Sequence, residues 1–461
     1  MKPATTTVTP AAYPASGIRD AVAAPGDPTG GLHASQRAQL IRRLVWRLLP
    51  FLMLCYLVAW LNRVNISFAA LQMNADIHLT SANYGLGAGL FFITYALLEV
   101  PSNLLLYRFG ARRWIARIMA SWGICAVAMA FVTGPNSFYL LRLLLGAAEA
   151  GFYPGILYFL TLWFPRAQRG SVLGIFLAAI PITGIVGAPA SGALLSLEGR
   201  LGLHGWQWLF IVEGLPSLLL APVVLRYLQD GPAQARWLSA PERSWLATTL
   251  NEEHRELERR KKYSVAQALT NPRVLLLAVM YFSNVCLMNG ITFFLPQIVK
   301  GFGLTNLQTG FVVAIPNLLA LAVLIWWGRR SDRSQERRGH AALANFLGGA
   351  ALLAATVLHD PLLKTIAIAW AFAFTLAFVA PFWVIPGTFL SGASAAGGIA
   401  AISAMGVLGG FIAPSVIGYL RDRSGDFRSG LTLVAVLALL VSVLFYVTSG
   451  RQDAEPDQVR P

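Results

Sequence analysis

Charged residues are scarce in this chain of 461 residues. Asp, Glu, Lys and Arg together make up 12% of it, whereas 56% of its residues are hydrophobic. Soluble domains carry about 25% charged residues. So little charge cannot keep so apolar a chain in water, and we expect lipid to be its solvent over most of its length. This excludes an ordinary soluble enzyme.

Clustered metal ligands and nucleophiles are also missing. The three cysteines, Cys55, Cys125 and Cys286, lie far apart in apolar segments, and the 6 histidines are scattered. No C-x-x-C spacing and no Cys/His cluster occurs, which argues against a metal site and a disulfide framework. No nucleophile–base pair is evident either. We therefore expect no metal, no cofactor and no enzymatic activity.

The net charge is +15, which by itself would suit nucleic acid. Most Lys and Arg residues, however, lie in short runs between apolar segments, where they set membrane topology. We therefore expect no nucleic-acid partner. The expected partners are the lipid bilayer, a proton and a small organic anion, bound by a monomer.

Twelve apolar segments approach the ~20 residues that a membrane span needs. They lie near 46–70, 83–106, 113–133, 137–163, 171–195, 206–227, 273–297, 309–328, 340–358, 363–389, 392–418 and 430–448. We predict an all-α membrane protein with twelve transmembrane helices. The expected division is a disordered cytoplasmic tail (1–44), a six-helix bundle (45–227), a cytoplasmic linker with a surface helix (228–272), a second six-helix bundle (273–448) and a cytoplasmic tail (449–461).

Basic residues indicate the orientation of these spans. With both termini in the cytoplasm, cytoplasmic loops hold Arg108, Arg112 and Arg113, and later Arg329, Arg330 and Arg333. The opposite loops are poorer, apart from Arg421, Arg423 and Arg428 in the last one. The sequence therefore predicts a multi-pass protein of the bacterial inner membrane with both termini inside.

The two halves of the chain share motifs at one offset. Arg333 lies 225 positions after Arg108, and Pro414 lies 225 positions after Pro189. Two matches at the same offset indicate two pseudo-symmetric six-helix bundles, as in transporters that rock two repeats around a central site.

These motifs carry a resemblance. The loops 108–113 and 328–338 resemble the signature of the major facilitator superfamily and its second copy, although Tyr107 stands where an Asp is common. The resemblance implies gating by these loops, through Arg108, Arg112, Gly328, Asp332, Arg333 and Arg337.

A narrower resemblance rests on three segments of the first half. The stretches 61–65 (LNRVN), 99–103 (EVPSN) and 142–154 (RLLLGAAEAGFYP) resemble the anion:cation symporter family. Within that family the chain is similar to bacterial tartrate, phthalate and hydroxyphenylacetate permeases. The resemblance implies that a cavity arginine binds the substrate anion and a nearby glutamate carries the proton.

Ionisable residues inside spans are functional candidates. The acids within the predicted spans are Glu99, Glu149 and Glu213, all in the first half. Arg142 and Glu149 are two helical turns apart and share a face, as do Tyr56 and Arg63. Two guanidinium groups at similar depth suit a carboxylate, so we predict Arg63 and Arg142 as the anion site and Glu149 as the proton carrier. The alternative is a purely structural ion pair, and structure is also our expectation for Glu99 and Glu213.

Asn62 stands where many family members carry an Asp, which removes one titratable group. We therefore expect fewer coupled protons, and an Arg63 that is unpaired when no substrate is bound. Further substrate contacts are expected from Tyr56, Trp60, Asn62, Asn284, Asn317 and Ser403. Aromatic residues such as Trp60, Phe91, Trp370, Phe382 and Trp383 favour a less hydroxylated or aromatic carboxylate, unless they merely pack helices.

Proton-coupled uptake of an organic anion by alternating access is the function that these residues predict. The alternative is efflux of a drug or metabolite by the same fold. Efflux of cations would favour acids in the cavity, whereas this cavity motif has as many arginines as acids.

Overall fold

The computed structural model describes residues 32–259, 271–334, 336–386 and 392–452. Within these ranges, 12 helices are long and apolar enough to cross a membrane, which confirms the predicted all-α membrane fold. The first half, as defined by the first six spans, contains α1 (Ala34–Val64) with α2 (Ile66–Asp76), α3 (Ser81–Phe109), α4 (Ala111–Ala128), α5 (Pro135–Glu149) with α6 (Phe152–Trp163), α7 (Arg166–Leu177) with α8 (Ala179–Leu194), and α9 (Gly205–Tyr227).

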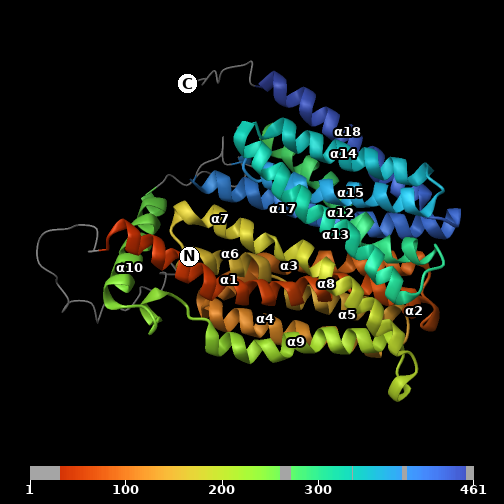
Figure 1. Ribbon diagram of the computed structural model, residues 1–461, viewed down its shortest axis with the longest axis horizontal. Helices are drawn as coiled ribbons and strands as arrows, with labels where there is room; N and C mark the ends of the chain where they lie inside the picture. The colour runs from red at the N-terminus through yellow and green to blue at the C-terminus, as the bar shows by residue number, and fades with distance from the viewer. Residues whose placement is uncertain (1–31, 260–270, 335, 387–391, 453–461) are drawn as a thin grey trace, which may run out of the picture.

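The second half contains α12 (Pro272–Lys300), α13 (Asn306–Ser334), α14 (Arg338–Val357), α15 (Pro361–Phe382), α17 (Gly392–Ser424) and α18 (Arg428–Gln452). Figure 1 shows the two halves as two layers, with α1, α4 and α9 in the lower one and α14, α15 and α18 in the upper one. The first helix begins at Ala34, inside the range expected as a tail.

The linker helix α10 (Ala240–Arg259) lies at one end of the spans, here called the linker end (Figure 1). Glu242 pairs with Arg43 at 3.0 Å, and Glu253 pairs with Arg169 at 2.9 Å. The predicted surface helix is therefore docked on the first half by two ion pairs. Arg260, Lys261 and Lys262 of the expected helix lie outside the described residues.

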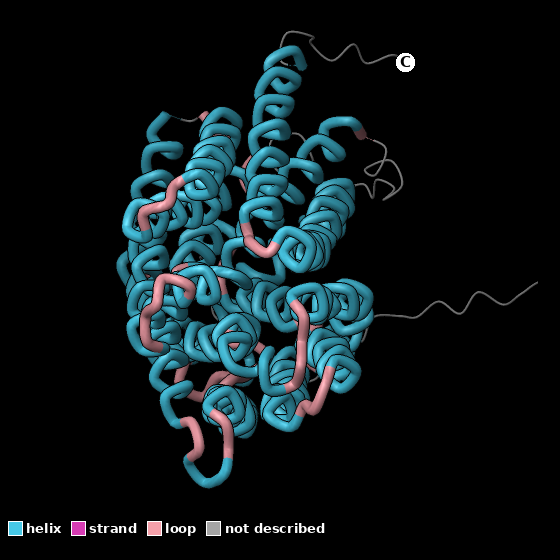
Figure 2. The backbone as a smooth tube through the Cα atoms, turned by 90° about the vertical axis from the view of Figure 1, so that its right-hand side faces the viewer, coloured by secondary structure: helices cyan, strands magenta, loops and turns pink. Residues whose placement is uncertain are grey.

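At the opposite, distal end the two halves meet. Loops 77–80, 198–204, 301–305 and 425–427 lie there, and Figure 2 looks onto this end. The hydroxyl of Tyr84 on α3 donates to the carbonyl of Phe293 on α12, at 2.9 Å. A Cβ on Gly85 would lie 2.2 Å from the Pro414 carbonyl oxygen, so glycine permits this approach of α3 to α17.

The fourth span is broken directly after Glu149. Gly151 has φ +85°, a left-handed conformation that ends α5 and lets α6 begin at Phe152. The Ser102 hydroxyl donates to the Ala150 carbonyl at 2.6 Å, and so satisfies a backbone group that the break leaves without a helical partner. The break fixes Glu149 at the end of a helix in the interior of the bundle.

Candidate anion and proton site

Arg63 of α1 and Glu149 of α5 form a direct ion pair. The Glu149 side chain is 2% exposed and that of Arg63 is 15% exposed. The expectation that Arg63 is unpaired is therefore wrong. Position 62 carries Asn and not Asp, but Glu149 in the last turn of α5 pairs with the Arg63 guanidinium instead. A buried pair of this kind loses its attraction if the carboxylate is protonated.

Aromatic rings surround the Arg63 guanidinium. Its central carbon lies 5.3 Å from the ring centroid of Trp60, 5.2 Å from that of Phe91 and 5.1 Å from that of Tyr95. Ring faces stabilise a cation without neutralising it. Arg63 therefore keeps a favourable environment even when its carboxylate partner is lost.

Arg142 lies next to this pair but bonds to backbone. Its Nε donates to the carbonyl of Gly87 and one terminal nitrogen donates to that of Ala88, both at 3.1 Å. The residue is 1% exposed and lies 5.0 Å from the centroid of Phe91, the ring that also flanks Arg63. The structure thus brings both predicted arginines to one aromatic ring.

Tyr56 belongs to an aromatic cluster on the same side of α1. Its ring centroid lies 4.7 Å from that of Phe176, 5.8 Å from that of Tyr153 and 6.3 Å from that of Trp60. Tyr56 is buried, whereas Tyr153 and Trp60 are half-buried. The cluster packs α1 against α6 and α7 beside the ion pair.

Asn62 faces the other way, toward α9. Its amide donates to the backbone carbonyl of Glu213 at 3.0 Å and to the Ser217 hydroxyl at 3.2 Å. The Glu213 carboxylate accepts a 2.7 Å hydrogen bond from Ser191. Asn62 and Glu213 thus lie in a seam within the first half, away from the Arg63 guanidinium.

The predicted polar residues of the second half are spread over different places. The Asn284 amide is buried and donates to Asn345 and to the Thr375 carbonyl, both at 3.3 Å. Asn317 donates to the Val313 carbonyl, and a Cβ on Gly184 would lie 2.0 Å from its side-chain oxygen. Asn317 therefore lies where α13 meets α8, while Ser403 is half-buried on α17.

The signature loop of the first half is capped by a distant residue. The Asp230 carboxylate accepts a 2.8 Å hydrogen bond from the backbone of Arg112, at the start of α4. Arg108 lies over the ring of Phe109, 5.7 Å from its centroid. Asp230 thus supplies an acid to the loop in which Tyr107 stands where an Asp is common.

The second signature loop uses its own residues. Asp332 and Arg337 form an ion pair of 2.6 Å, and Arg337 also donates to the Ser331 hydroxyl at 3.1 Å. Arg333 is exposed, and Gly328 lies where a Cβ would be 3.9 Å from Ala380. In the second loop an arginine side chain pairs with a carboxylate, whereas in the first the Asp230 carboxylate accepts from the backbone of Arg112.

Sequence reasoning did not single out Tyr95, Tyr153 or Tyr281. Tyr95 lies on α3 with its ring centroid 5.1 Å from the Arg63 guanidinium carbon, and Tyr153 lies on α6 in the aromatic cluster around Tyr56. Tyr281, on α12, stacks on Phe382 and meets Trp383 edge to face. The one-turn spacing of Tyr95 and Glu99 was a usable signal in the first half, whereas nothing local in the sequence distinguishes Tyr281.

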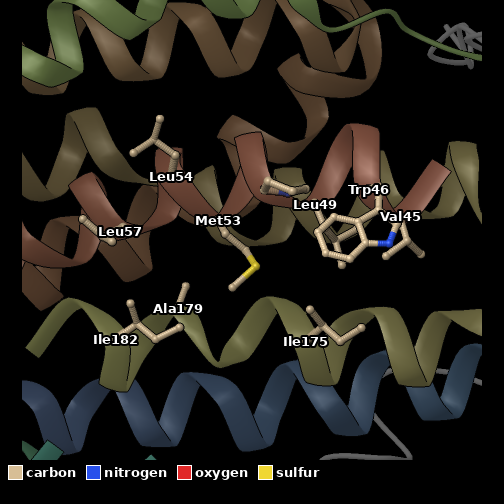
Figure 3. A pocket seen from close by; sticks show the side chains of 10 residues that line it. Val45, Trp46, Leu49, Met53, Leu54, Leu57, Ile175, Ala179 and Ile182 are labelled. Carbon is tan, nitrogen blue, oxygen red and sulfur yellow. The ribbon is translucent and has the colours of Figure 1, made fainter. Parts of the chain in front are cut away.

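A separate groove runs between α1 and α7/α8, with a volume of about 570 Å³. Figure 3 shows Trp46, Leu49, Met53 and Ile175 pointing into it from the two sides. Its ten lining residues are all apolar. Because anion and proton binding need polar groups, this groove is not the candidate site.

Comparison with known proteins defines the class. The family model of the major facilitator superfamily matches residues 52–396, and the chain belongs to that superfamily. It is a membrane transporter rather than an enzyme. A solved bacterial homologue of the human lysosomal transporter Spinster, in an inward-facing and unoccupied conformation, has a TM-score of 0.71 at 17% identity, covering 89% of this chain and 97% of that one, which shows the shared fold.

Two relatives are similar over nearly their whole length. A protein of Agrobacterium vitis, provisionally named as a tartrate transporter, is 44% identical over 93% of this chain and 99% of its own. A quinolone resistance transporter of Acinetobacter baumannii is 41% identical over 91% of this chain and 97% of its own.

Proposed function

We propose that this transporter takes up a small organic anion together with a proton across the bacterial inner membrane, by alternating access. The observation that carries the proposal is the direct Arg63–Glu149 ion pair beside the buried Arg142. The Agrobacterium relative named for tartrate, a small organic anion, supports the choice of substrate class.

The ion pair couples the two ligands through competition. While Glu149 is ionised it occupies Arg63, and a substrate carboxylate must displace it. A proton on Glu149 removes the attraction and frees the guanidinium, which grips a carboxylate with two parallel hydrogen bonds. Proton and anion then favour each other's binding, and their charges cancel in the membrane interior.

The number of coupled protons is set by Glu149 alone in this proposal. Asn62 cannot titrate, and its amide is engaged with α9. One proton per carboxylate makes the transport of a monoanion electroneutral, so the membrane potential would not drive its accumulation.

The distal end faces the periplasm in the proposed orientation, and both termini and α10 lie in the cytoplasm. Basic residues at the linker end, including Arg43, Arg169 and Arg333, support this orientation. Contacts between the halves at the distal end would then close the periplasmic side, and the two signature loops would gate the cytoplasmic side.

The test uses purified protein in proteoliposomes with a pH gradient. Glu149→Gln keeps the size of the side chain but cannot ionise, so gradient-driven accumulation of radiolabelled anion should vanish while anion exchange across equal pH persists. Asn62→Asp is the matched control, because residue 62 faces α9 and not the Arg63 guanidinium, and it should leave proton-driven accumulation intact. Proton-driven accumulation by Glu149→Gln would refute the coupling role.

Efflux remains the second candidate because of one relative, the quinolone resistance transporter of Acinetobacter baumannii. Cells that express the chain would then tolerate a quinolone better and accumulate less of it. Uptake of an organic anion and no change in quinolone accumulation would decide in favour of import.

A further inference from the structure

Two hollows follow each other along one face of α1. The apolar groove between α1 and α7/α8 has a volume of about 570 Å³, and a polar pocket of about 310 Å³ lies beyond it toward the linker end, between α1 and the start of α10. Most of the α1 residues that line them recur in steps of three and four, so they share a helix face. These residues are Gln36, Gln39, Arg43, Trp46, Pro50, Met53 and Leu57. Together the two hollows form an amphipathic strip, here called the α1 strip, which is polar at the linker end and apolar toward the bilayer interior.

The apolar part of the α1 strip has the length and the lining that an acyl chain needs. From Trp46 to Leu57, α1 rises about 17 Å, which is close to the thickness of the hydrocarbon of one leaflet, about 15 Å. Trp46 is 70% exposed, and Figure 3 shows its ring and the side chain of Met53 pointing toward α7 and α8. A peptide segment would leave backbone N–H and C=O groups unpaired against ten apolar lining residues, so a hydrocarbon chain is the better occupant.

The polar part of the α1 strip has an excess of positive charge. Arg43 and Glu242 form an ion pair of 3.0 Å and compensate each other, and Glu242 also accepts from the backbone of Ser239 at 2.9 Å. Arg42 is exposed and precedes Trp46 by one turn, and no ion pair in the described part of the chain involves it. An arginine suits a phosphate group, and tryptophan is enriched at the level of lipid headgroups. A negatively charged headgroup therefore fits this end of the strip.

We propose that the α1 strip binds an anionic phospholipid, with one acyl chain in the groove and the phosphate at Arg42. Basic residues where a transmembrane helix meets the cytoplasm attract acidic headgroups, and the linker end is cytoplasmic in the proposed orientation. Such a lipid contacts α1, α7 and the start of α10 at once, so it forms part of the surface on which the linker docks. Its binding does not depend on which anion the transporter carries.

The test measures lipid binding by native mass spectrometry on the purified, delipidated full-length protein in detergent. The probes are phosphatidylglycerol, which is anionic, and phosphatidylcholine, which is zwitterionic, with identical acyl chains. The wild type should bind phosphatidylglycerol about fivefold more tightly than phosphatidylcholine. Arg42→Gln should abolish this preference, because it removes the charge and leaves the groove intact. Met53→Gln places an amide in the groove, and it should weaken the binding of both lipids several-fold.

Arg113→Gln is the matched control, because Arg113 is also exposed at the linker end, in the first turn of α4. It should prefer phosphatidylglycerol as strongly as the wild type does. Unchanged melting temperatures in detergent alone would show that the variants are folded. Equal binding of the two lipids by the wild type, or an undiminished preference in Arg42→Gln, would overturn the proposal. Undiminished binding of both lipids by Met53→Gln would overturn it as well, because the acyl chain would then lie outside the groove.

Discussion

Asp422 at the end of α17 caps the start of α3 in the other half of the molecule. Its two carboxylate oxygens accept hydrogen bonds from the backbone N–H groups of Ser81 and Ala82, at 2.9 and 2.8 Å. A carboxylate at a helix N-terminus satisfies unpaired donors and opposes the positive end of the helix dipole. This contact ties the two halves together at the distal end.

Asp422→Ala should therefore favour opening of the distal end. A hydrogen bond to a charged group contributes about 1.5–3 kcal/mol, and exposure reduces that value, so we expect a several-fold shift in population. Labelling of a cysteine placed at the distal end should become faster by that factor. Asp426→Ala is the control, since Asp426 accepts from the backbone of Arg428 within its own half. Equal labelling rates in both variants would show that the cap does not hold the halves together.

Gly151→Ala should impair transport, because this residue shapes the break that places Glu149. A Cβ there would lie 2.3 Å from the Ser102 hydroxyl, and φ of +85° costs a residue with a side chain about 1–2 kcal/mol in addition. Gly303 makes a matched control: it has φ +82°, but a Cβ at this position would meet no atom within 4 Å. Gly303→Ala should carry the backbone cost alone and transport normally. Normal transport by Gly151→Ala, measured in proteoliposomes, would contradict this role of the break.

The loop at 198–204 should be stabilised in a defined pH window. Glu198 pairs with His204 at 2.7 Å and accepts from the Gly205 N–H at 2.6 Å. The hydrogen bond to Glu198 raises the pKa of His204. Partial burial acts to raise the pKa of Glu198, but the Gly205 N–H and His204 outweigh it and lower that pKa.

The contribution of the pair is complete when the carboxylate is ionised and the imidazole is protonated, between the unfolded pKa values of about 4.3 and 6.5. It declines as pH rises through the raised pKa of His204, and as pH falls through the lowered pKa of Glu198. The difference in melting temperature between the wild type and His204→Gln should therefore be larger at pH 5.5 than at pH 9. A difference independent of pH would show that His204 is not charged in this contact.

The length of the apolar segments was sufficient to predict the spans. A segment in lipid must form all its backbone hydrogen bonds internally, as a helix does, and its side chains are apolar whether they face lipid or the protein interior. The roles of Arg63, Arg142 and Glu149 remain predictions, although the structure pairs Arg63 with Glu149 and places Phe91 beside both arginines. The pairing of Arg63 with Glu149 was missed, since the spacing argument placed Glu149 with Arg142 on its own helix.

Contacts between segments far apart in the chain could not be predicted from the sequence. Asp230 reaches the loop that holds Arg112 although four spans separate the two residues along the chain, and Tyr84 of the first half donates to the carbonyl of Phe293 in the second. Neither Asp230 nor Tyr84 has a local pattern that distinguishes it from its neighbours. Such pairings depend on how helices are arranged around one another, which the periodicity of a single helix does not determine.

The docking of α10 on Arg43 and Arg169 also shortens the tether between the halves. With α10 held on the first half, 12 residues, 260–271, connect Arg259 to Pro272. Such a stretch reaches at most about 40 Å when fully extended, against about 150 Å for the whole of 228–271. The tether therefore limits how far the two halves can separate at this end. It does not set the direction in which they rotate, which depends on how the helices of the two halves pack against each other.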